Sequence, residues 1–249
     1  MFRGNSNFLR EHRKYGLARR GTMRILYDLA GADENRRFSP YCWRIKMALA
    51  HKGLDVECIP WRFTEKDEIS FSGQEKVPVL VDGENTVSDS WEIAKYLETE
   101  YPNTPSLKLD QGEVLFIKYW VETTLHSEIL QILVMDIHNS LAQKDQVYFR
   151  ESREKLFGKA LEEIVINRKE RLQHFQRLLA PLRTTLKKQE FVSGGTPGFS
   201  DYIVFGAFQW ARCISDFSLL KADDSICLWR KKMLALHQGL AMNAVGYPV

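Results

Sequence analysis

A serine and a proline stand at the start of an expected helix, where they can do chemistry. Ser39 precedes Pro40, and the helical run that follows ends at Gly53. Serine at the N-cap, proline at the first helical position and glycine just past the end form a complete set of helix signals. Unpaired N–H groups and the helix dipole at that start stabilise negative charge. The pattern predicts a hydroxyl that favours a bound thiolate, and the alternative is that Ser39 only caps the helix.

A hairpin with a proline at its entrance follows later in the chain. Residues 79–81 and 86–87 are expected to form two short strands around an Asp-Gly turn. Pro78 would stand at the start of the first strand, where a proline is tolerated because it need not donate a ladder hydrogen bond. A cis bond between Val77 and Pro78 would leave the amide and carbonyl of Val77 free to pair with an extended ligand.

A second helix is expected to begin directly after this hairpin. Asp89 and Ser90 stand at its start, and Glu92 lies in its first turn. The start of a helix can hold an anion, and a neighbouring carboxylate can pair with an ammonium group. The sequence therefore predicts a second anion-binding helix end.

In their order and spacing, these elements resemble the glutathione transferase family. The resemblance runs from Met23 to the end of the chain. It implies an α+β protein, in which a thioredoxin-like domain with a mixed four-stranded sheet and helices is followed by an all-α helical domain. Residues 38–44, 136–138 and 148–155 look like the β-etherase-like (Fua) branch of bacteria and fungi.

The resemblance also implies glutathione as the cosubstrate, with no metal, and a role for each residue near the two helix starts. Glutathione has a γ-glutamyl end with both charges, a middle cysteine and a glycyl carboxylate. The implied contacts are Asp89 to the ammonium, Ser90 and its helix start to the α-carboxylate, Val77 beside Pro78 to the cysteinyl backbone, Lys76 to a carboxylate and Ser39 to the sulfur. Ser39 is then the catalytic residue, because its hydrogen bond favours the thiolate.

The electrophile is expected to bind against the helical half. Aromatic side chains suggest an apolar pocket for a planar ligand, and the candidates are Tyr41, Tyr119, Trp120 and Tyr148. The branch resemblance implies that the thiolate displaces a phenolate from the carbon that bears an aryl ether. Three alternatives stay open: general conjugation of electrophiles, thiol-dependent reduction through Cys42, and a non-enzymatic carrier of aromatic ligands.

The cysteines and histidines indicate neither disulfides nor a metal site. Four cysteines in 249 residues have no framework or zinc spacing, so a reducing compartment is expected, and the cytoplasm is the predicted location. Cys42 is interpreted as a packed helix residue, because Ser39 replaces the first cysteine of a C-x-x-C pair. Asp136 and His138 are interpreted as part of a turn, and the branch resemblance implies the alternative of a place near the substrate pocket.

The helical half is expected to contain two long runs with apolar residues at helical spacing. The first covers about 113–138 and gives way to a loop at residues 139–140. The second covers about 148–186, with Pro181 as a kink or break.

A further helix is expected to begin near Gly198. The family usually has serine or threonine at this position, paired with Asp201 in a buried capping box. Because glycine has no hydroxyl, Asp201 is expected to cap the helix through its own carboxylate.

The expected domains are a glutathione-binding domain over 23–103, a linker over 104–112 and a helical domain over 113–249. Family members commonly form homodimers in which the first half of one subunit meets the second half of the other, and the resemblance implies the same here. Residues 1–22 form a basic leader. It is interpreted as a disordered extension, a segment upstream of a natural start at Met23, or an arginine-rich organellar transit peptide.

Composition and charge exclude two classes of partner. The chain is 44% hydrophobic and 12% aromatic, which is ordinary for a globular protein, and no apolar run approaches the ~20 residues that span a membrane. Residues 1–22 carry six basic side chains against Glu11 alone, a net of +5, so the formal +3 of the whole chain leaves −2 for the rest. The slightly negative charge of residues 23–249 therefore gives no reason to expect nucleic-acid binding.

Overall fold

A four-stranded mixed sheet forms the first part of the protein. The computed structural model describes residues 24–249, so the expectations for residues 1–22 lie outside the described residues. The strands are β1 (Arg24–Leu29), β2 (Val56–Trp61), β3 (Val79–Asp82) and β4 (Asn85–Ser88), in the order β2-β1-β3-β4. β1 pairs parallel with β2 and antiparallel with β3, which in turn pairs antiparallel with β4. The predicted mixed sheet and hairpin are confirmed.

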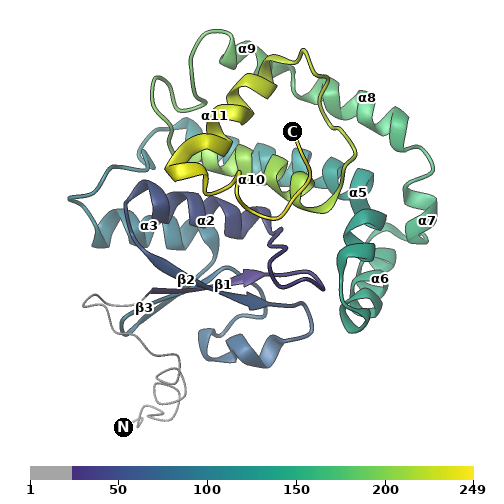
Figure 1. Ribbon diagram of the computed structural model, residues 1–249, viewed down its shortest axis with the longest axis horizontal. Coiled ribbons are helices and arrows are strands. Elements are labelled where there is room, and N and C mark those ends of the chain that lie inside the picture. The colour runs from purple at the N-terminus through teal and green to yellow at the C-terminus, as the bar shows by residue number, and fades with distance from the viewer. Residues whose placement is uncertain (1–23) are drawn as a thin grey trace.

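Two helices link this sheet to the second half. α2 (Pro40–His51) and α3 (Ser90–Glu100) lie between the sheet and the later helices, as Figure 1 shows. A short 3₁₀ helix, η2 (Lys66–Ser72), precedes β3. The predicted end of α2 is also confirmed, because Gly53 follows it with a φ of 68° that glycine adopts without strain.

The second half is helical, which confirms the α+β fold class. Its elements are α4 (Glu113–Trp120), the π-helical turn η3 (Val121–Leu125), α5 (His126–Ser140), α6 (Gln143–Phe157), α7 (Leu161–Ile164), α8 (Arg168–Leu178), α9 (Ala180–Leu186), α10 (Phe199–Ile214) and α11 (Ser225–Gly239). Apolar side chains from both halves form one continuous buried cluster. No helix in residues 24–249 is long and apolar enough to cross a membrane.

Two expectations about helix boundaries were wrong. The run expected over 148–186 is divided among α6, α7, α8 and α9, and the first break comes at Gly158, which has a φ of 66°. Apolar spacing continues through such breaks, because each short helix still buries one face against the same core. Residues 139–140 were expected to begin a loop, but α5 continues to Ser140, whose Oγ donates to the carbonyl of Ile137 at 2.7 Å.

Asp201 holds the start of α10 in the expected way. Its buried carboxylate accepts hydrogen bonds from the backbone N–H groups of Gly198, Val192 and Ser193 at 3.1, 2.7 and 3.0 Å. The indole of Trp229 in α11 donates to the same group at 2.9 Å. The predicted cap through the Asp201 carboxylate is confirmed, and it also joins α10 to α11.

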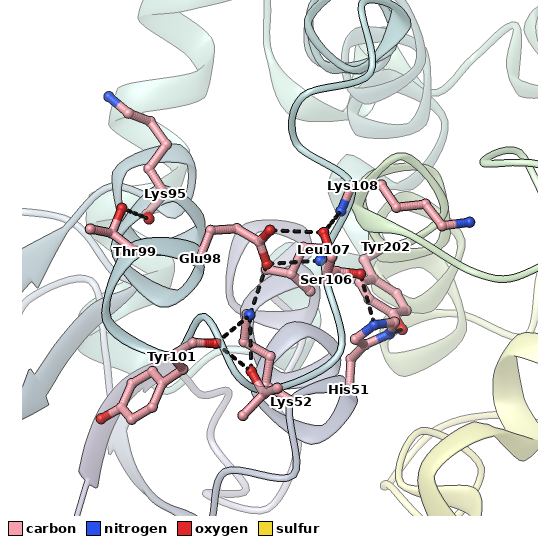
Figure 2. Close-up of polar contacts among 11 residues, drawn as sticks. His51, Lys52, Lys95, Glu98, Thr99, Tyr101, Ser106, Leu107, Lys108 and Tyr202 are labelled. Atoms are coloured by element: carbon pink, nitrogen blue, oxygen red, sulfur yellow. Dashed lines mark hydrogen bonds and ion pairs between the residues drawn. The ribbon is translucent and has the colours of Figure 1, made fainter.

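The end of α2 is fixed to the segment between α3 and α4. Figure 2 shows the ammonium of Lys52 pointing at Glu98 of α3, and the two groups are 2.8 Å apart. Lys52 also donates to the hydroxyl of Thr104 at 3.1 Å. Glu98 also accepts from the backbone N–H of Leu107 at 2.8 Å. Beside this group, His51 contacts the hydroxyl of Tyr202 in α10 through Nδ1 at 2.6 Å. These contacts attach the connecting segment to both halves.

The start of α2 is also in close contact with α10. A Cβ placed on Gly206 would lie 2.5 Å from the carbonyl oxygen of Pro40, closer than any real Cβ contact. Glycine at this position lets the two helix backbones approach. The first turn of α2 is therefore packed directly on the helical half.

Candidate functional site

Ser39 lies where the sequence predicted, at the N-cap of α2. Its side chain is 3% exposed, and its Oγ accepts a hydrogen bond from the backbone N–H of Cys42 at 3.2 Å. Pro40 occupies the first turn. Because the oxygen accepts this bond, the hydroxyl proton stays available for donation to a ligand at the helix start. The predicted cap is confirmed, and the geometry is compatible with both interpretations of Ser39.

Cys42 is packed in the interior. It is fully buried, and its sulfur lies 4.0 Å from the carbonyl oxygen of Tyr27. Burial raises the pKa of the Cys42 thiol well above its ordinary value, and the carboxylate of Asp28 adds to this effect. The interpretation of Cys42 as a packed helix residue is confirmed. A neutral, buried thiol is a poor nucleophile.

The hairpin entrance has the predicted geometry. The Val77–Pro78 peptide bond is cis, Pro78 is buried, and Val77 is half-buried immediately before β3. Lys76 is exposed beside it. The neighbouring Glu75 pairs with Lys66 at 2.6 Å, so the ion pair at this corner does not use Lys76.

Asp89 and Ser90 form the start of α3. Asp89 has a φ of 71° and a ψ of 131°, a backbone conformation that a residue other than glycine rarely adopts, and it is exposed. Its Oδ1 accepts from the N–H groups of Trp91 and Glu92 at 2.8 and 3.3 Å. Both bonds use the same oxygen, which leaves Oδ2 for a cation. Ser90 is 2% exposed and lies at the first helical position.

A buried arginine that the sequence did not single out connects the two helix starts. Arg44 of α2 is fully buried, and its Nη1 donates to Ser90 Oγ at 3.5 Å and to Glu122 at 2.7 Å. Its Nε and Nη2 have no hydrogen-bond partner in the described residues. Glu122 lies in the π-helical turn η3 and also pairs with Lys118 at 2.9 Å. Arg44 therefore joins α3, α2 and the helical half in one charged contact.

The four predicted aromatic residues are only partly brought together. Tyr41 is half-buried, with its ring 4.7 Å from the Arg44 guanidinium. Tyr148 is 37% exposed and stacks on Phe63, with ring centroids 6.0 Å apart. Trp120 is half-buried and Tyr119 is 56% exposed, and both lie on α4.

Two of these aromatic positions lie near Ser39 through residues that the sequence analysis did not name. Phe63, the partner of Tyr148, also contacts Phe38, the neighbour of Ser39, with ring centroids 6.4 Å apart. The ring of Tyr41 meets the edge of His126 at 5.2 Å. Phe63 and His126 could have been suspected only from their residue types, because their partners are far away in the sequence.

Burial keeps the Tyr41 hydroxyl and the His126 imidazole neutral. Burial raises the pKa of Tyr41, and burial together with the charge of Arg44 lowers the pKa of His126 well below its ordinary value. His126 is therefore an uncharged imidazole at neutral pH, with a ring nitrogen that has no partner in the described residues. Within residues 24–249 no group of His, Cys, Asp or Glu side chains could hold a metal ion.

A thioredoxin-like sheet, two helix starts joined by Arg44 and a helical second half together define the transferase fold that uses glutathione. Models of two successive domains of one protein family match the chain. "Glutathione S-transferase, N-terminal domain" matches residues 35–105, and "Glutathione S-transferase, C-terminal domain" matches residues 114–223. The chain belongs to the glutathione S-transferase family.

Curated relatives agree with this assignment. The chain is 32% identical over 107 residues to a zeta-class glutathione S-transferase of Euphorbia esula, covering 41% of this chain and 47% of the relative. It is 26% identical over 168 residues to glutathione S-transferase U2 of Arabidopsis thaliana, covering 66% and 64%. The chain spans about half or less of the length of the first curated relatives that it matches.

Solved structures with the same fold include two Fua-type enzymes of Phanerochaete chrysosporium. GSTFuA3 has a TM-score of 0.76 at 23% identity, covering 84% of this chain and 95% of that one. GSTFuA2 has a TM-score of 0.69 at 27% identity, covering 88% and 94%. A glutathione S-transferase of Ceriporiopsis subvermispora, CsGST83044, was solved in complex with glutathione and has a TM-score of 0.74 at 21% identity, covering 87% and 98%. These neighbours support the resemblance to the Fua branch.

Proposed function

We propose that this protein is a glutathione transferase that activates the glutathione thiolate for attack on an aromatic electrophile. The observation that carries the proposal is the pair of helix starts held together by the 3.5 Å contact between Arg44 and Ser90. One start presents the buried hydroxyl of Ser39, and the other presents Ser90 beside Asp89. Two helix N-termini fit a ligand with a thiolate and a carboxylate.

The residue roles follow from this placement. Asp89, with Oδ2 free, would receive the ammonium, and Ser90 with the first N–H groups of α3 would receive the α-carboxylate. The backbone of Val77 would pair with the cysteinyl residue, while the exposed Lys76 would reach a carboxylate at the edge. Ser39 would donate to the sulfur.

The energy required of Ser39 and its helix is modest. A free thiol has a pKa of about 8.5, so only a few per cent is ionised at pH 7. Lowering that pKa by about two units corresponds to about 2.7 kcal/mol. A charge-assisted hydrogen bond and a helix N-terminus together supply a stabilisation of this size.

The aromatic electrophile is the finer part of the proposal. Phe63 contacts the rings of Tyr148 and of Phe38, the residue before Ser39, and the ring of Tyr41, two residues after Ser39, contacts His126. Planar ligands pack well against such rings. Resemblance to the Fua branch favours cleavage of a β-aryl ether, in which the thiolate attacks the carbon and a phenolate leaves. Trp120 and Tyr119 are proposed as more distant contacts.

Two alternatives remain as outcomes of a test. A non-enzymatic carrier would bind aromatic ligands without turnover of any electrophile. A reductase that uses Cys42 is disfavoured, because that thiol is fully buried and its pKa is raised. Turnover of a generic aromatic electrophile with glutathione separates an enzyme from a carrier, and turnover of a β-aryl ether separates ether cleavage from general conjugation.

Binding of glutathione is tested by thermal shift. Millimolar glutathione should raise the melting temperature, because a ligand that binds only the folded state stabilises it. Ser90→Ala should weaken binding by about 1.5 to 3 kcal/mol, since it removes a hydrogen bond to a charged group. Ser127→Ala, which removes an exposed hydroxyl from α5, is the matched control. Absence of any shift in the unmodified protein would remove the basis of the proposal.

We further propose a homodimer in a reducing compartment such as the cytoplasm. α4 presents three large apolar side chains to solvent: Leu115, Phe116 and Tyr119 are 46, 70 and 56% exposed. Tyr119 lies three residues after Phe116 and four after Leu115, so it neighbours both on the helix surface, and such a patch is the kind that a second subunit covers. All four cysteines are free, as expected where thiols stay reduced.

A further inference from the structure

A cavity lies in the helical half, between α10, α11 and the end of the chain. Its volume is about 200 Å³, and its walls include Phe208 and Arg212 of α10, Phe217 and Leu219 of the following loop, and Arg230 of α11. The C-terminal segment closes it, since the backbone N–H of Tyr247 donates to the carbonyl of Arg212 at 2.9 Å. Figure 1 shows the chain end returning over α10 beside α11.

This cavity is on the opposite side of α10 from the candidate active site. Its lining residues Phe208, Ala211 and Arg212 recur at helical spacing and share one face of α10. Trp210, which contacts His126 at 5.7 Å between ring centroids, lies two residues after Phe208 and therefore points the other way. A ligand in this cavity would not compete with glutathione.

The two arginines that line the cavity differ in their hydrogen bonds. The guanidinium of Arg212 donates to the carbonyl oxygens of Ala241, Met242 and Ala244 at 3.1, 3.0 and 3.2 Å, so its task is to hold the C-terminal segment. The Nε of Arg230 is buried and has no hydrogen-bond partner in the described residues. The guanidinium carbon of Arg230 lies 5.9 Å from the centroid of the Phe208 ring, so an aromatic wall of the cavity is its neighbour.

The charge of Arg230 is also uncompensated. Burial lowers the pKa of Arg230 to about 10, and the nearby Arg212 acts in the same direction, so the group is still a cation at neutral pH. The opposing influences come from the thiols of Cys227 and Cys213, with no carboxylate of residues 24–249 among them. Asp216 lines the cavity but is exposed at its rim. Arg230 is half-buried, and a partly desolvated cation without an anion costs free energy, which a bound anion would recover.

We propose that this cavity is a second binding site, which takes a small planar organic anion such as an aromatic carboxylate. Arg230 would receive the carboxylate, because its planar fork matches two carboxylate oxygens. The rings of Phe208 and Phe217 would contact the apolar body of the ligand. The volume favours a single ring, since pockets for drug-sized molecules measure about 300 to 1,000 Å³.

Benzoate is the probe for this site. Titration calorimetry and thermal shift on the full chain should detect benzoate binding, and Arg230→Gln should weaken it about 10- to 100-fold, the loss of one charge-assisted contact. Lys231→Gln is the matched control, because it removes the same charge from the next, exposed residue of α11 and should leave the affinity unchanged. Benzamide has the same ring without the charge. Its affinity for the unmodified protein should be no higher than the affinity of benzoate for Arg230→Gln.

Measurements with glutathione test whether benzoate binds outside the glutathione site. They also test whether Arg230→Gln is folded. Arg230→Gln should keep its thermal shift with glutathione, and without ligand its melting temperature should equal or exceed that of the unmodified protein, because a half-buried charge without an anion has been removed. Equal benzoate affinity in Arg230→Gln and the unmodified protein would overturn the proposal. So would the absence of benzoate binding, or competition between benzoate and glutathione.

Discussion

Ser39 is the residue on which the proposed chemistry depends, and its two interpretations differ in a measurable way. As a cap, its oxygen accepts from Cys42 at 3.2 Å and holds the first turn of α2. As a catalytic group, it uses the remaining proton to stabilise a thiolate. Replacement by alanine removes both interactions, but only the second affects the ionisation of bound glutathione.

Ser39→Ala should therefore move the pH profile of turnover. If Ser39 lowers the thiol pKa by hydrogen bonding, the ascending limb, where the rate rises as bound glutathione loses its proton, should move upward by about one to two pH units in the variant. Cys42→Ala is the comparison, and it should leave the profile in place because the Cys42 thiol is buried. An unchanged profile in Ser39→Ala would mean that backbone N–H groups hold the thiolate without the hydroxyl.

Single residues also show what the sequence could and could not predict. Ser39, Asp89 and Ser90 were predictable, because caps depend on residues within one turn of each other. Arg44 was visible as a charge inside an apolar helix, but its partner Glu122 is 78 positions away in the chain. Long-range pairs of this kind depend on how the two halves pack, which no local pattern encodes.

At the scale of elements, the start of α10 is capped without the hydroxyl that the family resemblance implies at position 198. Asp201 supplies the cap, and Ser193 occupies the space beside Gly198 that a larger side chain would need. A Cβ on Gly198 would lie 2.7 Å from Ser193 Oγ and 2.9 Å from Ser193 Cβ. The buried Oγ of Ser193 has no partner in the described residues.

Gly198→Ser should therefore destabilise the protein, although it restores the usual capping residue. The clash should cost about 1 to 3 kcal/mol, as overpacking does, against a capping gain of about 1 kcal/mol. Adding Ser193→Gly to Gly198→Ser should recover most of that loss, because it vacates the space. Urea unfolding measures each step, and Gly195→Ser, with nothing within 4 Å of its added Cβ, is the control. A stabilised single variant would contradict this account.

The kink near the end of α11 should make stability depend on pH. His237 has a φ of 51° there, and its Nε2 lies 3.2 Å from the hydroxyl of Tyr202. Burial lowers the pKa of His237 to about 4, whereas an unfolded histidine titrates near ~6.5. Between these values the unfolded chain binds more protons, so stability falls as the pH falls.

The melting temperature should therefore drop between about pH 7 and pH 5, and His237→Gln should reduce that drop. His174→Gln, which changes an exposed histidine on α8, is the control and should behave like the unmodified protein. Parallel pH profiles for the His237 and His174 variants would exclude His237 as the source of the pH dependence.

Helix boundaries were predictable where a cap or a glycine marks them. α2, α3 and α10 begin at or beside the expected residues. The division of 148–186 into four helices was missed, although Gly158 carried a signal, because apolar spacing was given more weight than a single glycine. The turn η3 could not have been expected, since nothing local in residues 121–125 distinguishes a π-helical turn from an α-helix.

At the scale of the whole molecule, the apolar face of α4 is the testable basis of the proposed homodimer. Phe116→Asp should convert the dimer to a monomer of about 29.0 kDa, because a charge at the centre of a buried interface has no partner. Light scattering measures the mass. Leu156→Asp is the control, since Leu156 is 65% exposed on α6, and it should leave the mass unchanged. A monomer without any substitution would refute the dimer.

The contact between Gly206 and Pro40 has a consequence for motion. Because a backbone-to-backbone contact leaves no room for a side chain, the first turn of α2 cannot tilt without displacing α10. The helix that carries Ser39 is then effectively a part of the helical half, and the two halves should not open as hinged bodies during turnover. Substrates would have to enter and products leave through rotations of side chains at the mouth of the site, on the timescale of nanoseconds rather than of domain closure.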